Sequence, residues 1–167
     1  MVNDMHITIE QPKSITIDLK NRYQRIRDGD FPDIDSNIIP LLEQLNEFDN
    51  VVTNWSCGGH ESDSNFPHVV CAVGDMGYAI LEYFIVSLIN DPTIRLMKLQ
   101  DLIEPKLMTL ILPIDLTHTD NKILWYLAIV ITFKSLDPKE VSIFINTSIE
   151  ILKKMHTQRL AHDKANS

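Results

Sequence analysis

The stretch NVVTNWSCGGHESDSNFPHVVCAV, residues 50–73, decides how the rest of the chain is interpreted. Its two ends, VVTNW and HVVCAV, are rich in β-branched residues and are typical of short strands. The segment between them contains the glycine, serine, aspartate, asparagine and proline that mark turns and loops. The pattern therefore predicts a strand over Asn50–Trp55, a specialised loop, and a second strand over His68–Val73.

Before this stretch, the spacing of apolar residues predicts mostly helix. The elements expected there are a short strand over His6–Ile9, a helix within Ser14–Arg27, an acidic turn, and a helix that begins at Asp35 or Ser36 and ends near Phe48. Pro40 fits the last of these because a helix tolerates proline in its first turn. Asp35 or Ser36 is the expected N-cap, since short polar side chains accept the first free amides of a helix.

After this stretch, an almost wholly apolar run predicts a buried helix over Met76–Asn90. Strands are expected over Thr93–Leu99, Lys106–Ile114 and Lys122–Phe133. Asp137 followed by Pro138 indicates a helix start, and the apolar stripe continues to about Arg159. The result is an α/β (α+β) fold with a mixed central sheet and flanking helices. One domain covers residues 1–161, residues 162–167 form a frayed tail, and the strand order stays open.

Composition and charge exclude several classes of function. The chain has 167 residues, 44% hydrophobic and 23% charged, as in ordinary single-domain globular proteins. A formal charge of −8 disfavours long nucleic acids and anionic membranes as partners, because both require a basic surface. Two cysteines are too few for a disulfide framework. Without an apparent signal peptide or an apolar run of roughly 20 residues, we expect a cytoplasmic protein that does not enter a membrane.

The loop after the first strand of the opening stretch is the candidate site. Glycines let backbone amides converge on an anion, serine donates a hydrogen bond, and histidine binds anions or transfers protons. Trp55 offers a ring for stacking. The residues of this loop that are expected to bind the ligand are Thr53, Asn54, Trp55, Ser56, Cys57, Gly58, Gly59 and His60.

Other interpretations of these residues remain open. The loop could be an ordinary turn that ends a strand. Cys57 and His60 could bind zinc with His68 and Cys71, but residues three apart in a strand point to opposite faces, so no metal site is assigned. Cys57 could also be a nucleophile activated by His60, although the sequence identifies no third, orienting group. The acidic turn before Asp35 is interpreted as a solvated segment.

The segment Asp28–His60, with DIDSNIIPLLEQLNEFDNVVTNWSCGGH at its centre, resembles the wybutosine-synthesis tRNA methyltransferase family. That family has an acidic segment, a helix that ends in an Ile-Asn-like pair, and a strand that enters a T-x-S-S-C-S-G-R loop. The matching positions here are Asp35, Leu45-Asn46, Thr53, Ser56, Cys57 and Gly59. The resemblance implies a pocket for S-adenosylmethionine and tRNA lined by Asp35, Ser56 and Cys57. The family's Lys-Gly pair is replaced around Phe31-Pro32, its first loop serine is Trp55, and its loop arginine is His60.

Two functional hypotheses follow. In the first, the protein binds a small anionic or nucleotide-like ligand at the SCGGH loop and sequesters a nucleotide-derived signal. In the second, it is an S-adenosylmethionine-dependent RNA methyltransferase, as the resemblance implies. The missing lysine and arginine favour the first, because they are the charges that a tRNA phosphate requires. A homo-oligomer is an open alternative, with the strand over 123–133 or the helix that begins at Met76 as its interface, but burial of both segments in the core is the favoured interpretation.

Overall fold

The computed structural model describes residues 8–10, 34–60, 65–74, 76–112 and 122–165. Within these ranges the chain forms one sheet and a set of helices. Its elements, in chain order, are β1 (Thr8–Glu10), α2 (Ile39–Asn46), β2 (Val51–Cys57), β3 (His68–Val73), α3 (Gly77–Ile89), α4 (Pro92–Leu96), a 3-10 turn η2 (Gln100–Leu102), β4 (Ile103–Leu112), β5 (Lys122–Phe133) and α5 (Pro138–Ala165).

β5 is the central strand of a five-stranded sheet. β4 pairs with it antiparallel along one side, from Ile103 opposite Phe133 to Leu112 opposite Leu124. β3 pairs antiparallel with residues 127–132 of β5, and β2 continues the sheet beyond β3. β1 pairs parallel with the beginning of β5. The sheet is therefore antiparallel except at β1.

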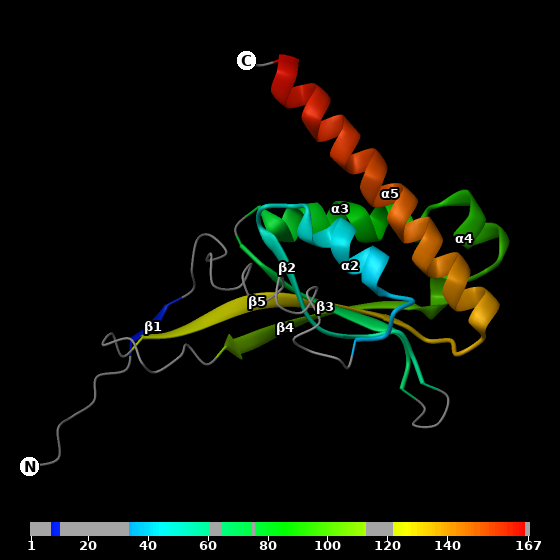
Figure 1. The fold of residues 1–167 in the computed structure, drawn as a ribbon, viewed down its shortest axis with the longest axis horizontal. Coiled ribbons are helices and arrows are strands. Elements are labelled where there is room, and N and C mark those ends of the chain that lie inside the picture. The colour runs from blue at the N-terminus through cyan, green and yellow to red at the C-terminus, as the bar shows by residue number, and fades with distance from the viewer. Residues whose placement is uncertain (1–7, 11–33, 61–64, 75, 113–121, 166–167) are drawn as a thin grey trace, which may run out of the picture.

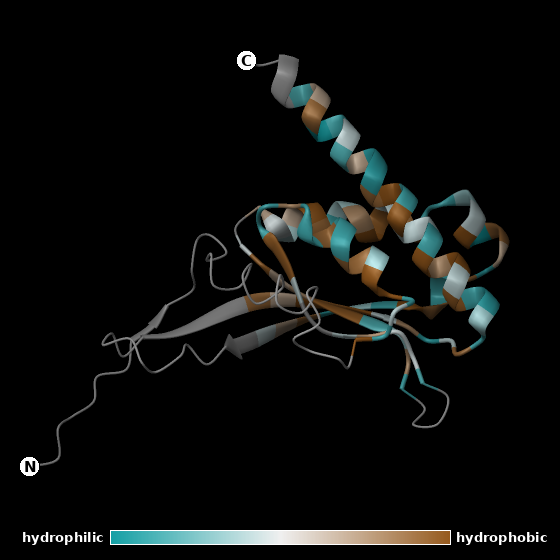
Figure 2. Cartoon of the chain, viewed as in Figure 1, coloured by the Kyte–Doolittle hydropathy of each residue, from teal (hydrophilic) through white to brown (hydrophobic). Residues whose placement is uncertain are grey.

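The helices lie together on one face of the sheet (Figure 1). α5 packs on α2, α3 and α4, and its C-terminal turns extend beyond the sheet. Hydrophobic residues occur in both the sheet and the helices (Figure 2), and buried side chains from both layers form one core. Phe133 of β5 stacks on Phe144 of α5 with ring centroids 4.6 Å apart, and both side chains are buried. The sequence prediction of a mixed α/β fold with one sheet and flanking helices is confirmed.

Most predicted elements are confirmed, with boundaries that differ by a few residues. β3 and β5 have the predicted bounds, and β1, β2, β4, α3 and α5 match predicted elements. Pro40 lies in the first turn of its helix. α5 continues through Ala165, past the predicted end near Arg159. The helix predicted within Ser14–Arg27 and most of the acidic turn lie outside the described residues.

Two predictions of local structure are wrong. The segment predicted as a strand over Thr93–Leu99 contains helix α4, because Asp91 caps it by accepting hydrogen bonds from the amides of Thr93 and Ile94. The apolar residues there had suggested a strand, although Asp91-Pro92 is the same start signal that was recognised before α5. The second error concerns α2, whose N-cap is Ile38 without a side-chain cap, and which ends at Asn46. Asp35 lies before the helix and contacts the SCGGH loop instead.

Ser148 leads to a prediction about stability. Its side chain on α5 is fully buried, and its hydroxyl has no hydrogen-bond partner among the described residues. A buried hydroxyl without a partner costs about 1–3 kcal/mol, and alanine is the better helix former. We therefore expect Ser148→Ala to raise the free energy of unfolding by about 1 kcal/mol in urea titrations. Ser87→Ala on α3 is the control, and a less stable Ser148→Ala protein would contradict the prediction.

The two elements proposed as oligomer interfaces have different surroundings. β5 is paired on both sides, and its described core residues are buried, so its backbone is not an open sheet edge. α3 has a buried face but also exposes Met76, Tyr83 and Val86. Self-association through α3 therefore stays a prediction. In the described part of the chain, no helix combines the length and the apolar character that crossing a bilayer requires.

Candidate functional site

The SCGGH loop begins where β2 leaves the sheet. The register between β2 and β3 shifts between Asn54 and Cys57, which marks an irregularity in the strand just before the loop. Gly59 follows with φ of +93°, a conformation that side chains with a Cβ rarely adopt. His60 then forms an antiparallel bridge with Asn65 through two backbone hydrogen bonds of 2.9 and 3.2 Å. The loop is thus held at both ends by backbone pairing.

Asp35 connects the loop to the segment before α2. Its carboxylate accepts a 2.7 Å hydrogen bond from the Gly58 amide and lies 3.3 Å from Nε2 of His60. The Asn37 side chain donates to the Gly58 carbonyl at 3.3 Å. The His60 side chain is 46% exposed and that of Asp35 24% exposed, so the pair lies at the surface and solvent screens it. Asp35 therefore organises the loop rather than capping a helix.

These hydrogen bonds change the role expected of the glycine amides. The Gly58 N–H donates to Asp35, and the Gly59 N–H donates to Sγ of Cys57 at 3.3 Å. The His60 N–H donates to the Asn65 carbonyl. In the described conformation the Gly58 amide donates to a carboxylate of the protein and the Gly59 amide donates to a thiol, so binding of a ligand anion by these amides stays a prediction and would require them to exchange partners.

A second contact joins α2 to the strand that leads into the loop. The Asn46 side chain donates to Oγ1 of Thr53 at 2.6 Å and accepts the Thr53 amide at 3.0 Å. Thr53 is 4% exposed, so Asn46 satisfies both of these groups away from water. Thr53 therefore has a structural role, because its hydrogen bonds with Asn46 hold β2 against α2.

The zinc set considered from the sequence does not assemble. Cys71 is fully buried in the core on β3, and burial raises its thiol pKa from 9.0 to about 12. His68 uses Nδ1 in a 2.9 Å contact with the Phe66 carbonyl. Cys57 and His60 instead lie with Asp35, and one ligand atom from each is within 4.8 Å of the others. Asp35 therefore lies beside Cys57 and His60, where the sequence identified no third group.

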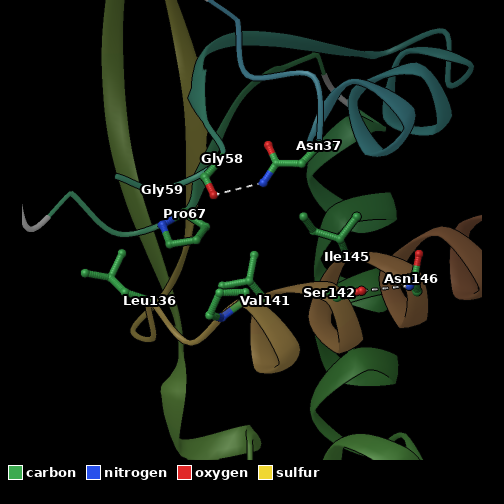
Figure 3. A pocket seen from close by; sticks show the side chains of 10 residues that line it. Asn37, Gly58, Gly59, Pro67, Leu136, Val141, Ser142, Ile145 and Asn146 are labelled. Atoms are coloured by element: carbon green, nitrogen blue, oxygen red, sulfur yellow. Dashed lines mark hydrogen bonds between the residues drawn. The ribbon is translucent and has the colours of Figure 1, made fainter. Parts of the chain in front are cut away.

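A cavity of about 400 Å³ opens beside the loop. Gly58, Gly59 and Pro67 form one wall, and the start of α5 forms the opposite wall (Figure 3). The polar side chains that the described residues contribute are uncharged, and those of Ser142 and Asn146 bond to each other at 3.2 Å. Among the described residues, the lining consists of Asn37, Gly58, Gly59, Pro67, Leu136, Pro138, Val141, Ser142, Ile145 and Asn146.

Another cavity of about 480 Å³ lies between α3 and the later turns of α5. Phe48, Met76, Tyr83 and Met155 are among its lining residues, and it is the larger of the two. Its one cation, Arg159, forms a 2.8 Å ion pair with Asp49. Size alone does not identify a ligand site. We take the smaller cavity as the candidate site because the glycines of the SCGGH loop line it together with the polar residues Asn37, Ser142 and Asn146.

The sequence prediction of the site is incomplete. Asp35, Cys57, Gly58, Gly59 and His60 are brought together, Thr53 lies below them, and Ser56 is half-buried at the end of β2. Asn54 and Trp55 belong to β2, but their side chains lie outside the described part. Sequence reasoning missed Asn37 and the wall formed by α5. Asp137-Pro138 located the start of that helix, but nothing in the sequence placed it opposite the loop.

Comparisons of the chain with protein-family models, with curated proteins and with solved structures find no match.

Proposed function

We propose that the protein binds a small nucleoside- or nucleotide-like ligand in the cavity between Gly58–Gly59 and the start of α5, and that it sequesters this ligand. The observation that carries the proposal is the cavity itself. Its volume of about 400 Å³ falls within the roughly 300–1,000 Å³ of known ligand sites. That volume accommodates a base and sugar.

The lining supports a ligand whose buried part is uncharged. Asn37, Ser142 and Asn146 supply amide and hydroxyl groups that can both donate and accept hydrogen bonds, as recognition of a base edge or sugar hydroxyl requires. Apolar contacts come from Pro67, Val141 and neighbouring residues. A phosphate in the loop itself would meet the Asp35 carboxylate, which also lies 3.3 Å from Nε2 of His60, so an anionic part is expected to point out of the cavity toward solvent.

The experiment is a thermal-shift panel on the full chain. It contains nucleosides, NAD, ADP-ribose species, cyclic mono- and dinucleotides, S-adenosylmethionine and S-adenosylhomocysteine. A ligand at 100 times its Kd should add about 2.7 kcal/mol to the free energy of unfolding, which raises Tm by several degrees. Each ligand is then released by denaturation and weighed. Intact recovery of a stabilising nucleotide supports sequestration, whereas a cleaved or modified product contradicts it.

Variants in the cavity locate the site. Asn146→Ala removes an exposed polar group from the lining, and Ser142→Phe fills the space with a ring. Both should reduce the thermal shift by at least half while leaving the Tm of the free protein within a few degrees of wild type. Asn90→Ala is the matched control, because Asn90, the C-cap of α3, is also an exposed asparagine that bonds four residues back. An undiminished shift in both cavity variants would place the ligand elsewhere.

A methyltransferase remains the second proposal, and one observation favours it. Positions that carried the family resemblance lie in contact in pairs: Asn46 with Thr53, and Asp35 with the Gly58 amide next to Cys57. Stabilisation by S-adenosylmethionine or S-adenosylhomocysteine alone within the panel would support this function and displace sequestration. If neither compound shifts Tm at millimolar concentration, the methyltransferase proposal fails.

A further inference from the structure

We propose that Asp35, Cys57 and His60 form a binding site for one zinc ion with an open coordination position. Among the residues that the structure describes, these three form a cluster of metal-ligating side chains in which one donor atom from each lies within 4.8 Å of the others. The inference concerns the chain alone and does not depend on the proposed nucleotide ligand.

The set of donor atoms selects the metal. A thiolate, an imidazole and a carboxylate combine one soft, one borderline and one hard ligand. Zinc binds all three types, whereas Mg²⁺ and Ca²⁺ prefer oxygen ligands. When Cys57 binds as a thiolate, its proton passes to solvent. The two negative ligands then balance the charge of the ion, which a site of two neutral ligands would not do.

The backbone brings the ligands together with little freedom. Cys57 and His60 are separated by two residues, as in many zinc sites, and the positive φ of Gly59 turns the chain between them. The His60–Asn65 bridge holds the far side of this turn. Asp35, the third ligand, lies in the segment before α2. With metal–ligand bonds of about 2.0–2.3 Å, a tetrahedral ion requires the donor atoms to lie closer to one another than 4.8 Å, so the three side chains must move together when the ion binds.

Hydrogen bonds around the ligands orient them. The Gly58 amide donates to Oδ2 of Asp35 at 2.7 Å. The Gly59 amide and the Asn65 side chain donate to Sγ of Cys57 at 3.3 and 3.6 Å. Outer hydrogen bonds of this kind fix ligand orientation and stabilise a thiolate in metal sites. Because His60 is 46% exposed and Asp35 24% exposed, a fourth ligand can approach from solvent.

Three protein ligands and one open position are typical of zinc sites that bind an exogenous molecule. Gly58 and Gly59, which lie between the ligands Cys57 and His60, also line the cavity described above. An ion here would place a cationic centre next to that cavity. The described residues that line the cavity include no lysine or arginine. An oxygen atom of a ligand, such as one from phosphate or water, is the chemistry that this position would accept.

The test is a Co²⁺ titration of the full chain, after dialysis against a chelator, under reducing conditions and without nucleotide. We expect one Co²⁺ per chain, a thiolate-to-cobalt charge-transfer band, and loss of the band when Zn²⁺ is added. His60→Gln and Asp35→Asn should each weaken Co²⁺ binding at least ten-fold. His68→Gln is the matched control for the imidazole. Wild-type protein without the band, or unchanged binding in both variants, would overturn the inference.

The thiolate is assigned without relying on a single variant. The chain has two cysteines, so Cys71→Ala should keep the band and Cys57→Ser should lose it. If Cys57→Ser fails to fold, retention of the band in Cys71→Ala still assigns the thiolate to Cys57. Loss of the band in a folded Cys71→Ala protein would overturn the assignment. Failure of the nucleotide panel leaves these spectra unaffected, so the two proposals fail separately.

Discussion

Gly77→Ala should destabilise the protein by about 3 kcal/mol or more, the upper end of what overpacking costs. A Cβ on Gly77 would lie 2.0 Å from the carbonyl oxygen of Asn50 and 3.1 Å from Cβ of Val73. The Asn50 carbonyl belongs to the backbone just before β2, and it accepts the Gly74 amide at 2.9 Å. Neither group is the flexible end of a side chain. α3 must therefore move away from the sheet to accommodate the methyl group.

The loss of stability expected for Gly77→Ala is informative because its sign is opposite to that of the helix propensities. On helix propensity alone, alanine in place of glycine stabilises a helix by about 1 kcal/mol, so the expected loss opposes the local preference. Urea unfolding of the two proteins measures the difference. Glu82→Ala, an exposed change on the same helix, should stay within about 0.5 kcal/mol of wild type. A Gly77→Ala protein as stable as wild type would show that α3 does not pack this closely on β2 and β3.

The second large effect is expected at Gly58. A Cβ there would lie 2.0 Å from Oδ1 of Asn37 and 2.8 Å from Cβ of Asp35. The Asn37 side chain must turn away, and the Asp35 segment must shift from the loop. We expect Gly58→Ala to cost about 1–3 kcal/mol. Asp35, Asn37 and Gly58 all belong to the proposed sites. We therefore expect the affinity of the protein for the nucleotide and its affinity for Co²⁺ each to fall at least ten-fold.

A double variant separates the clash from a general loss of structure. Asn37→Ala removes the nearest atom, so Asn37→Ala/Gly58→Ala should be more stable than the sum of the two single changes predicts. The rescue is expected to be partial, because the contact with Cβ of Asp35 remains. Strict additivity of the two changes in urea unfolding would contradict the close approach of Asn37 to the loop.

Strong local signals made much of the fold predictable. The β-branched runs gave β3 and β5 their bounds, and Asp137-Pro138 located the start of α5. The apolar residues around α4 favour a strand, which is why the pattern alone does not predict this helix. The capping signal of Asp91-Pro92 determines the structure that forms. The pairing of β5 with β1, β3 and β4 was not predictable, because it depends on contacts between segments far apart in the sequence.

The candidate site was predictable only where its residues are neighbours in the sequence. Cys57, Gly58, Gly59 and His60 were recognised as one loop, and Asp35 entered through the family resemblance. The hydrogen bond from Gly58 to Asp35 spans 23 positions, and no local pattern specifies it. The same limit hid Asn37, Ser142 and Asn146, which are ordinary polar residues until the fold places them around one cavity.

The most direct test of ligand binding in this cavity is a two-dimensional ¹H–¹⁵N spectrum of the full chain, titrated with each nucleotide of the panel. If the proposal is correct, at least one nucleotide shifts the backbone amides of Gly58, Gly59, Ser142 and Asn146, which lie on opposite walls of the cavity. Amides around Met76 and Tyr83 at the larger cavity stay in place. Shifts confined to Met76 and Tyr83, or none with any nucleotide, would contradict it.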